Sequence, residues 1–197
     1  KDIPCYIFSD EIYSSIHFGQ QHLSIATVKD MAARTIISDG FSKTYAMTGW
    51  RLGYGIFPLE LVPHVINIQR NSVSAAAAFT QIAGLAALEG PQDSVPTMVN
   101  AYRDRRDVLI EGINRIPGIS CPLPQGAFYA FPDIRGTGIP SLRFAEIAME
   151  QGVALLAGTA FGTYGEGFIR LSYATGIDRI NSGLERIESL VKKAAKR

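Results

Sequence analysis

The chain has 197 residues, of which 47% are hydrophobic and 19% are charged, and its formal net charge is +1. This length allows one large domain or two small domains with a hydrophobic core. A charge so close to zero gives no electrostatic reason to expect nucleic acid or an anionic membrane as a partner. No apolar run is long enough to span a membrane and no signal peptide opens the chain, so we expect a cytoplasmic protein.

The cysteines and histidines show no pattern of disulfide or metal chemistry. Cys5 and Cys121 are far apart in the sequence and lie in apolar contexts, which predicts two buried thiols in a reducing compartment. The three histidines, His17, His22 and His64, do not have the spacing of metal ligands. We therefore predict no metal site.

The first predicted element is a buried parallel strand over residues 5–9, a short apolar run. Asp10 follows at its carboxyl end, where open α/β sheets bind ligands, and Tyr13 points to the same side if the chain turns helically. The structural alternative for Asp10 is a helix cap or a turn. Glu11 is interpreted as a surface or capping residue, and residues 14–34 as a loop followed by a short helix.

The most informative stretch is residues 38–55, SDGFSKTYAMTGWRLGYG. Apolar residues at 35–37 and 52–57 predict a strand on either side, so Lys43 falls in a connection between strands, where α/β proteins place chemistry. The small neighbours of Lys43 let a bulky ring approach the backbone, and its amine can condense with an aldehyde. The alternative is a solvated loop lysine.

Helical spacing of apolar residues predicts three further helices, at 59–69, 79–88 and 94–116. The last is long and ends at Pro117-Gly118, and its charged face at residues 103–107 is interpreted as solvated. We place the domain boundary on this helix. The expected parts are residues 1–92, a connecting helix over 93–117, and a second domain over 118–197.

The second domain alternates between strands and helices. Strands are predicted at 119–123, 127–131, 153–156 and 168–174. One helix, 142–151, is expected to be capped by Ser141, and Asp178 is expected to cap a final helix with an apolar stripe. This order of elements, together with the first part, indicates an α/β protein.

Arg170 lies between Ile169 and Leu171 in one of these strands. Burial of a guanidinium there is costly unless an anion meets it. A structural ion pair and a ligand anion both satisfy that condition, and the sequence leaves the two open. The planar fork of arginine suits a carboxylate bound through two hydrogen bonds.

Several segments together resemble class I and II aminotransferases, the aspartate aminotransferase-like enzymes of fold type I. The lysine signature is carried by Gly40-Phe-Ser-Lys43, Ala46-Met47 and Gly49-Trp-Arg-Leu-Gly53, and further likeness by residues 10–13, 124–132 and 161–174. Many members of the family have serine where this chain has Gly40. The resemblance covers essentially the whole chain but only the C-terminal half of the family's polypeptide.

The resemblance implies pyridoxal 5'-phosphate (PLP) as cofactor and a role for each matching residue. Lys43 would form the Schiff base with the cofactor and act as general base and acid, Asp10 would bond the pyridine nitrogen, and Tyr13 the ring hydroxyl. Arg51 would bind the phosphate, with Ser42 as a further candidate. Arg170 would bind the α-carboxylate of the substrate.

The implied fold is the remainder of a large three-layer α/β/α domain with a mostly parallel sheet, followed by a smaller α+β domain. The implied reaction is transamination of an α-amino acid with a 2-oxo acid, by a homodimer whose subunits meet near residues 71–79. We expect the 197 residues alone to be an incomplete and inactive fragment. The alternatives are a carbon–sulfur lyase or synthase on the same scaffold, and the ligand-sensing domain of a transcription regulator.

Overall fold

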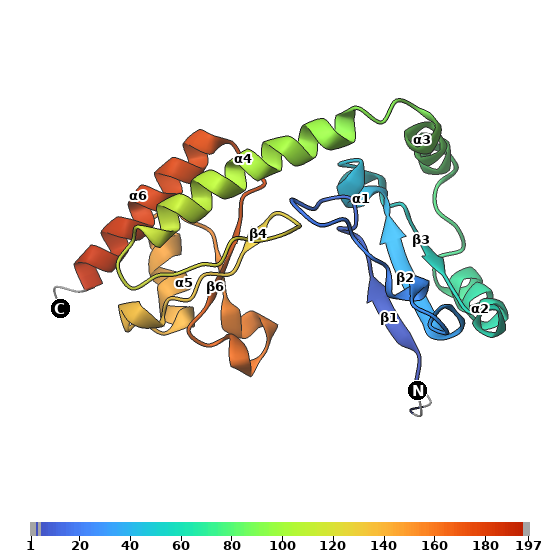
Figure 1. Ribbon diagram of the computed structural model, residues 1–197, viewed down its shortest axis with the longest axis horizontal. Coiled ribbons are helices and arrows are strands. Elements are labelled where there is room, and N and C mark those ends of the chain that lie inside the picture. The colour runs from blue at the N-terminus through green and yellow to red at the C-terminus, as the bar shows by residue number, and fades with distance from the viewer. Residues whose placement is uncertain (1–2, 4, 195–197) are drawn as a thin grey trace. The chain divides into compact units, whose positions relative to one another are not determined.

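The computed structural model describes residue 3 and residues 5–194, and the chain divides into two compact units (Figure 1). Unit 1 is Lys1–Met98 and unit 2 is Val99–Arg197. The division falls inside helix α4, Ser94–Asn114, which begins at the predicted residue and ends two residues before Ile116. The long helix on which the sequence placed the domain boundary is thus present.

Unit 1 contains a sheet of three strands in the order β1-β2-β3, with β1 at Ile7–Asp10, β2 at Thr35–Gly40 and β3 at Gly53–Ile56. Strands β1 and β2 are parallel, whereas β2 and β3 are antiparallel. The predicted α/β class is confirmed. The described sheet has one parallel and one antiparallel pairing, so it is mixed rather than mostly parallel.

Three helices accompany this sheet, namely α1 at Phe41–Thr44, α2 at Val62–Ser72 and α3 at Ala78–Glu89. The helix predicted from residue 59 begins later, because Leu59–Leu61 form a 3-10 turn before a helix with proline in its first turn. The short helix predicted before residue 34 is wrong. Two 3-10 turns lie there instead, and the first ends where Val28 returns to extended backbone.

The prediction of a fully buried first strand is also wrong. Phe8 is 66% exposed and Tyr6 47% exposed, and the thiol of Cys5 is exposed as well. The reason is that, among the described strands, β1 pairs only with β2 and is an edge strand, and Phe8 borders an open cavity that Val65 and Ile66 of α2 also line.

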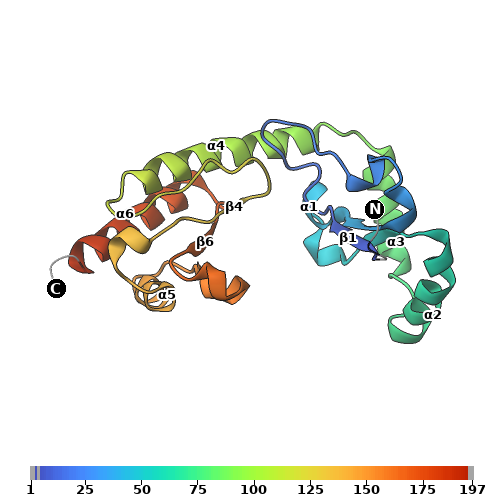
Figure 2. The same ribbon diagram turned by 60° about the horizontal axis from the view of Figure 1, so that its bottom comes forward.

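Unit 2 contains a second sheet, in the order β4-β6-β5, with both pairings antiparallel. Its strands are β4 at Tyr129–Ala130, β5 at Leu156–Ala157 and β6 at Ile169–Ser172. Helices α5, Ser141–Glu150, and α6, Ile177–Ala194, complete the unit. Helices α4 and α6 run side by side in both views (Figures 1 and 2), and a Cβ on Gly112 would come within 2.3 Å of Leu184.

The helices and the sheet of unit 2 enclose a hydrophobic core. The apolar stripe predicted on α6 is confirmed, with Ile180, Ile187 and Val191 buried. The largest side chains of unit 2 with at most 2% exposure are Ile113, Ile134, Phe144, Ile169, Tyr173, Ile187 and Leu190.

All four strands predicted in this unit are shorter in the structure, and β6 itself covers four of the seven residues predicted at 168–174. The regions 119–123 and 127–131 contribute an isolated bridge at Ser120 and the two residues of β4, because Ala127 has a φ of 58° and the prolines of this segment lack an N–H for a ladder. The region 153–156 contributes only the first residue of β5. The length of these strands depends on pairing with β6 and not on local apolar content.

Three residues of unit 2 do not have the predicted environment or helix position. Arg106 was expected on a solvated face, but it is 5% exposed because it donates to the carbonyl of Pro124 at 3.0 Å and to Asp107 at 2.8 Å. Ser141 is the first residue of α5 rather than its cap, and its Oγ accepts a hydrogen bond from Gly167 N at 2.7 Å. Asp178 likewise lies within the first turn of α6.

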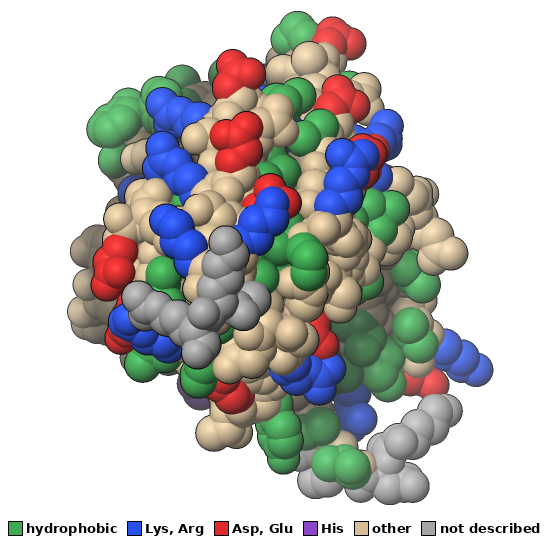
Figure 3. All heavy atoms as spheres, turned by 90° about the vertical axis from the view of Figure 1, so that its left-hand side faces the viewer, with side chains coloured by type: hydrophobic (Ala, Val, Ile, Leu, Met, Phe, Trp, Pro, Cys, Tyr) green, Lys and Arg blue, Asp and Glu red, His purple; other side chains and the backbone are tan. Residues whose placement is uncertain are grey.

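The surface carries both signs of charge. Basic and acidic side chains are interspersed on the face shown in Figure 3, and pairs such as Lys192–Glu188, at 2.7 Å, place opposite charges one helical turn apart. Among the described residues, no helix combines the length and apolarity needed to cross a membrane, and no group of three or more side chains is arranged to hold a metal ion.

Candidate active site

The parallel pairing of β1 and β2 brings the two predicted reactive segments to the same edge of the sheet. Asp10, the last residue of β1, lies opposite Ser38 of β2, and β2 ends at Gly40, just before the helix that carries Lys43. The carboxyl ends of parallel strands are where such sheets bind ligands. Asp10 is exposed there, and its Oδ1 accepts a hydrogen bond from Ile12 N at 3.2 Å, which shapes the turn.

Tyr13 lies next to Lys43. Residues 12–15 form a hydrogen-bonded turn and not a regular helix, with Ile16 N donating to Tyr13 O at 2.9 Å. The turn places the Tyr13 ring so that its centroid is 5.9 Å from Lys43 Nζ, and both side chains are half-buried. The structure therefore brings together Lys43 and Tyr13, with Asp10 at the same strand end.

The loop that carries Lys43 is anchored at its base. Phe41 N donates to Leu52 O at 3.2 Å and closes the loop, and the buried Phe41 ring stacks on Tyr45 at 5.7 Å. Helix α3 covers this base closely, since a Cβ on Gly84 would come within 2.4 Å of Leu52 Cδ2. These contacts fix the end of the segment from which Lys43 extends.

A glycine pair explains the departure from the family pattern at Gly40. Gly40 lies opposite Gly53 in the β2–β3 ladder. A Cβ on Gly40 would lie 2.9 Å from Gly53 Cα and 3.0 Å from Leu52 O, which is closer than backbone atoms allow. Ser42 lies in helix α1, next to Lys43, and is half-buried.

Arg51 lies at the C-terminal end of the segment that carries Lys43, two residues before Gly53. Its backbone has φ 54° and ψ 48°, a left-handed conformation that is strained for a residue with a side chain. The exposed guanidinium donates from Nη1 to Thr48 O at 3.1 Å. It lines a cavity of about 880 Å³ with Trp50 and Phe79. The other predicted site residues of unit 1 do not line that cavity.

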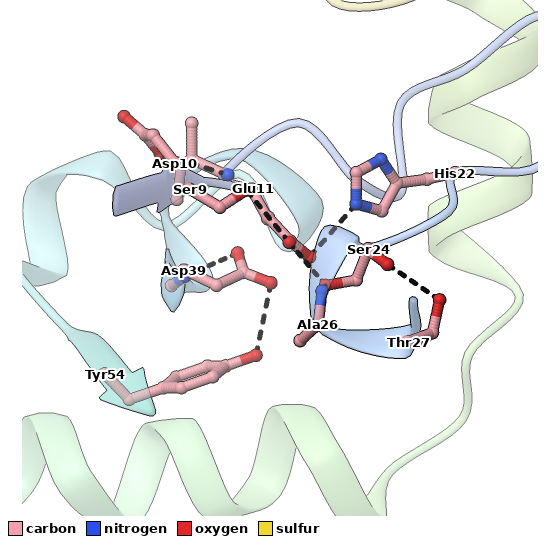
Figure 4. A network of polar contacts seen from close by, with 11 residues as sticks. Ser9, Asp10, Glu11, His22, Ser24, Ala26, Thr27, Asp39 and Tyr54 are labelled. Atoms are coloured by element: carbon pink, nitrogen blue, oxygen red, sulfur yellow. Dashed lines mark hydrogen bonds and ion pairs between the residues drawn. The ribbon is translucent and has the colours of Figure 1, made fainter. Parts of the chain in front are cut away.

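Glu11 is not the surface residue that the sequence predicted. Its side chain is 8% exposed and accepts hydrogen bonds from Ser24 Oγ at 2.6 Å and Ser9 Oγ at 3.1 Å, with His22 Nε2 3.0 Å from its other oxygen (Figure 4). Burial raises the pKa of the Glu11 carboxyl, but these hydrogen bonds outweigh burial and hold the pKa below its ordinary value.

The hydrogen bonds of Glu11 fix the turn that follows β1. Glu11 ties residues 22–24 to the end of β1, directly after Asp10. In Figure 4 the Glu11 side chain reaches toward His22 and Ser24, whereas Asp10 lies on the opposite side of the strand end. Sequence reasoning missed Glu11 because its partners come from a loop with no regular pattern.

A second polar contact lies at the carboxyl end of β2. Tyr54 donates a hydrogen bond to Asp39 Oδ2 at 3.2 Å, and Asp39 Oδ1 accepts from Gly40 N at 2.6 Å (Figure 4). Burial, and after it the charge of Asp39, raises the pKa of Tyr54. This contact links Tyr54 of β3 to Asp39, which is one residue before the end of β2 and the start of the segment that carries Lys43.

Arg170 lies in unit 2, on the central strand β6. Its Cζ is 4.6 Å from the ring centroid of Tyr129 and 4.6 Å from that of Phe161, and the residue is half-buried. Among the described residues, no carboxylate pairs with it. The sequence left two partners open for Arg170, a structural ion pair and a ligand anion. The structural ion pair is not observed among the described residues.

The groups in unit 1 fit the chemistry of PLP. The cofactor needs an amine for its aldehyde, a carboxylate for its pyridine nitrogen and a cation for its phosphate. Residues of these three types occur at one end of the sheet, since Asp10 ends β1, Lys43 follows β2, and Arg51 lies two residues before the antiparallel strand β3. The exposed carboxylate of Asp10 and the exposed guanidinium of Arg51 are both accessible to a ligand.

Comparison with known proteins agrees with this geometry. The family described as "Aminotransferase class I and II" matches residues 1–187. The aspartate aminotransferase of Pyrococcus horikoshii is 37% identical over 196 residues, which cover 98% of this chain and 50% of that protein. The aspartate aminotransferase of Musicola paradisiaca is 41% identical over 189 residues, covering 94% and 47%.

Solved structures give the same result. The crystal structure of an aromatic aminotransferase from Pyrococcus horikoshii OT3 superposes with a TM-score of 0.92 at 38% identity, covering 95% of this chain and 51% of that one. The chain thus spans about half the length of the curated relatives it matches. On this evidence the chain belongs to the class I and II aminotransferase family.

Proposed function

We propose that the full-length protein containing this chain transaminates an α-amino acid with a 2-oxo acid, with PLP bound covalently to Lys43. The observation that carries the proposal is the placement of Lys43 beside Tyr13, with the exposed Asp10 at the same strand end, in a chain of this family. Members of the family use PLP, and the related aminotransferases use amino acids and 2-oxo acids.

When bound, PLP supplies an aldehyde for covalent attachment and a ring that withdraws electrons from the substrate. The Lys43 amine would hold the cofactor and, once the substrate displaces it, carry the Cα proton away and return it. The ionised Asp10 would accept a hydrogen bond from the pyridine nitrogen and keep that nitrogen protonated. Tyr13, next to Lys43, would contact the ring hydroxyl.

The remaining predicted residues would bind the two anions. Arg51 would contact the cofactor phosphate, with the hydroxyl of Ser42 as a second donor. Arg170 would bind the substrate α-carboxylate, which supplies the anion that its half-buried guanidinium lacks among the described residues.

The proposal extends to the parts of the protein outside this sequence. Because the relatives are about twice as long, we infer that residues beyond these 197 complete the large domain and the cofactor site. The chain by itself is then inactive. The full protein would be a cytoplasmic homodimer, as dimers are typical of the related enzymes.

Borohydride reduction of the full-length protein with PLP tests the covalent assignment. The reduced label should map to Lys43, should be lost in Lys43→Ala, and should persist in the matched control Lys29→Ala, an exposed lysine of the same unit. A label at any other lysine would overturn the assignment.

A half-reaction test separates transamination from the alternatives. An amino acid alone should convert the cofactor to its amine form and release the matching 2-oxo acid. Release of a cleaved side chain would instead indicate a lyase, and ligand binding without turnover would indicate a sensing domain.

A further inference from the structure

One face of the unit 2 sheet concentrates aromatic side chains around Arg170. Along β6, Ile169 and Leu171 are buried, so Arg170 and Ser172 point to the other face. Tyr129 of β4 pairs with Ser172 and therefore shares that face. On the other side of β6, Leu156 of β5 pairs with Arg170, and the chain continues from β5 into the 3-10 turn that ends at Phe161.

The two aromatic rings thus approach Arg170 from segments on opposite sides of the central strand. Each ring centroid is 4.6 Å from Arg170 Cζ, within the range of a cation–π contact. A guanidinium is planar and all its N–H donors lie in the plane. Contacts with ring faces therefore restrict the orientation of that plane and leave its hydrogen-bonding edge available.

Further rings support both of these contacts. Phe161 meets Phe131 edge to face at 6.0 Å, and Phe131 stacks on Phe168 at 5.4 Å with an interplanar angle of 9°. Tyr129 packs against Phe128, which is 8% exposed, at 4.8 Å. Tyr129 is therefore backed by a buried ring, whereas Phe161, which is 51% exposed, is supported by a cluster of rings at the surface of unit 2.

Nearby acidic groups are engaged elsewhere. Asp133 Oδ1 accepts a hydrogen bond from Arg135 Nε at 3.0 Å, and Glu166 Oε1 accepts one from Ser141 N at 2.9 Å. The Arg170 cation is thus oriented by neutral rings, which leave its charge available to an incoming anion.

We propose that Tyr129 and Phe161 are positioning residues that hold the Arg170 guanidinium with its N–H edge directed toward the substrate carboxylate. This inference rests on the proposed function, in which Arg170 binds that carboxylate. Its specific content is that the two rings act on the substrate only through Arg170.

The test compares one amino acid with its amine lacking the carboxylate. In the full-length protein loaded with PLP, the half-reaction rate is measured with L-alanine and with ethylamine. The variants are Tyr129→Leu and Phe161→Leu, with Tyr129→Phe to retain the ring and Arg170→Gln as reference. Tyr164→Leu, at a residue 99% exposed and three positions from Phe161, is the control.

We expect each leucine variant to lower the preference for L-alanine over ethylamine by roughly fivefold to tenfold, the size of one cation–π contact. The loss should fall on KM for L-alanine, with the ethylamine rate nearly unchanged. Tyr129→Phe should restore the preference, and Tyr164→Leu should match the parent protein.

Three outcomes would overturn the positioning role. Equal losses with L-alanine and ethylamine would mean that the rings only support the fold. An unchanged preference in both leucine variants, with a loss in Arg170→Gln, would leave the proposed function intact and remove the role of the rings. If Arg170→Gln itself keeps the preference, the carboxylate contact at Arg170 fails, and the role of the rings fails with it.

Discussion

The two units of the chain differ in how completely they bury their own apolar side chains. In unit 2, Phe144 and Ile169 are fully buried, and the helices and strands close over them. In unit 1, all four residues of β3 are exposed and helix α2 has no buried residue. The difference shows that unit 2 encloses a hydrophobic core within the described residues, although it also exposes side chains such as Leu142 and Met149, whereas unit 1 leaves much of its apolar surface uncovered.

The groups proposed to bind the cofactor lie in the more open unit. Asp10 ends β1, Lys43 follows β2 and Arg51 precedes β3, and the segments that carry them are fixed by local hydrogen bonds. Arg170, in contrast, extends from a strand supported by the closed core of unit 2. Local hydrogen bonds therefore set the positions of the residues proposed to bind the cofactor, whereas packing of the unit 2 core sets the position of Arg170.

The largest expected effect compares one phenylalanine from each unit. Phe144→Ala removes a fully buried ring and should lower the free energy of unfolding of unit 2 by about 3–5 kcal/mol. Phe8→Ala, at a residue 66% exposed, should change stability by less than about 1 kcal/mol in the 197-residue chain. Denaturant unfolding followed by hydrogen exchange of each unit measures both changes.

Phe144→Ala and Phe8→Ala can also be compared in the full-length protein. If residues outside this sequence cover β1, Phe8→Ala should there cost several times more than in the 197-residue chain. A large cost of Phe8→Ala already in the shorter chain would contradict the exposed edge of unit 1.

The sequence predicted the elements whose signal is local. Helices α3, α4 and α6 lie within a few residues of their expected bounds because each has an apolar stripe or a defined start and stop. The lysine signature likewise identified its loop, since a motif is contiguous in the chain. Short strands such as β4 and β5 were overestimated, because their length depends on which residues pair with β6.

Burial of charged residues was the main failure, for the same reason. Glu11 is buried through contacts with Ser24 and His22, and Arg106 through Pro124, partners that lie 11 to 18 positions away in the sequence. No periodicity reports such contacts. The approach of Lys43 to Tyr13 also follows from the parallel register of β1 and β2, which the sequence suggested only through resemblance.

The next largest effect concerns Glu11, whose hydrogen bonds fix the turn after β1 in unit 1. Glu11→Ala removes a buried carboxylate and leaves the hydroxyls of Ser9 and Ser24 without their acceptor, so it should cost about 2–3 kcal/mol. Glu89→Ala, at an exposed residue on α3, is the matched control and should cost less than about 0.5 kcal/mol. Equal costs would contradict the buried network.

The contribution of Glu11 should depend on pH. Because the pKa of Glu11 is lowered in the folded state, its stabilisation is complete above the unfolded pKa of about 4.3 and is lost as pH falls through the folded value. The difference in stability between the parent and Glu11→Ala should therefore shrink below about pH 4. Urea unfolding at a series of pH values measures this difference, and a constant difference would show that ionised Glu11 is not stabilising.

A smaller effect is expected in the core of unit 2. The Tyr173 ring is fully buried and its hydroxyl donates to Ala127 O at 3.2 Å, so Tyr173→Phe should cost about 1 kcal/mol. Burial raises the pKa of Tyr173, so folding favours the neutral phenol. That preference stabilises the protein fully below the unfolded pKa of about 10 and is lost as pH rises above it, a loss that Tyr173→Phe should reduce.

The smallest effect is expected on the outer surface of unit 2, where charge contributes little. Glu111 of α4 forms an ion pair with Arg115, the residue after the end of that helix, and their side chains are 67% and 74% exposed. Water and salt screen such a pair, so Glu111→Ala should change the free energy of unfolding by less than about 0.5 kcal/mol, and less still in 1 M salt. Arg106→Ala, on the same helix, should cost more because it also removes buried packing and the bond to Pro124. If Glu111→Ala were as costly as Arg106→Ala, burial would not be what separates the strong from the weak charges of this unit.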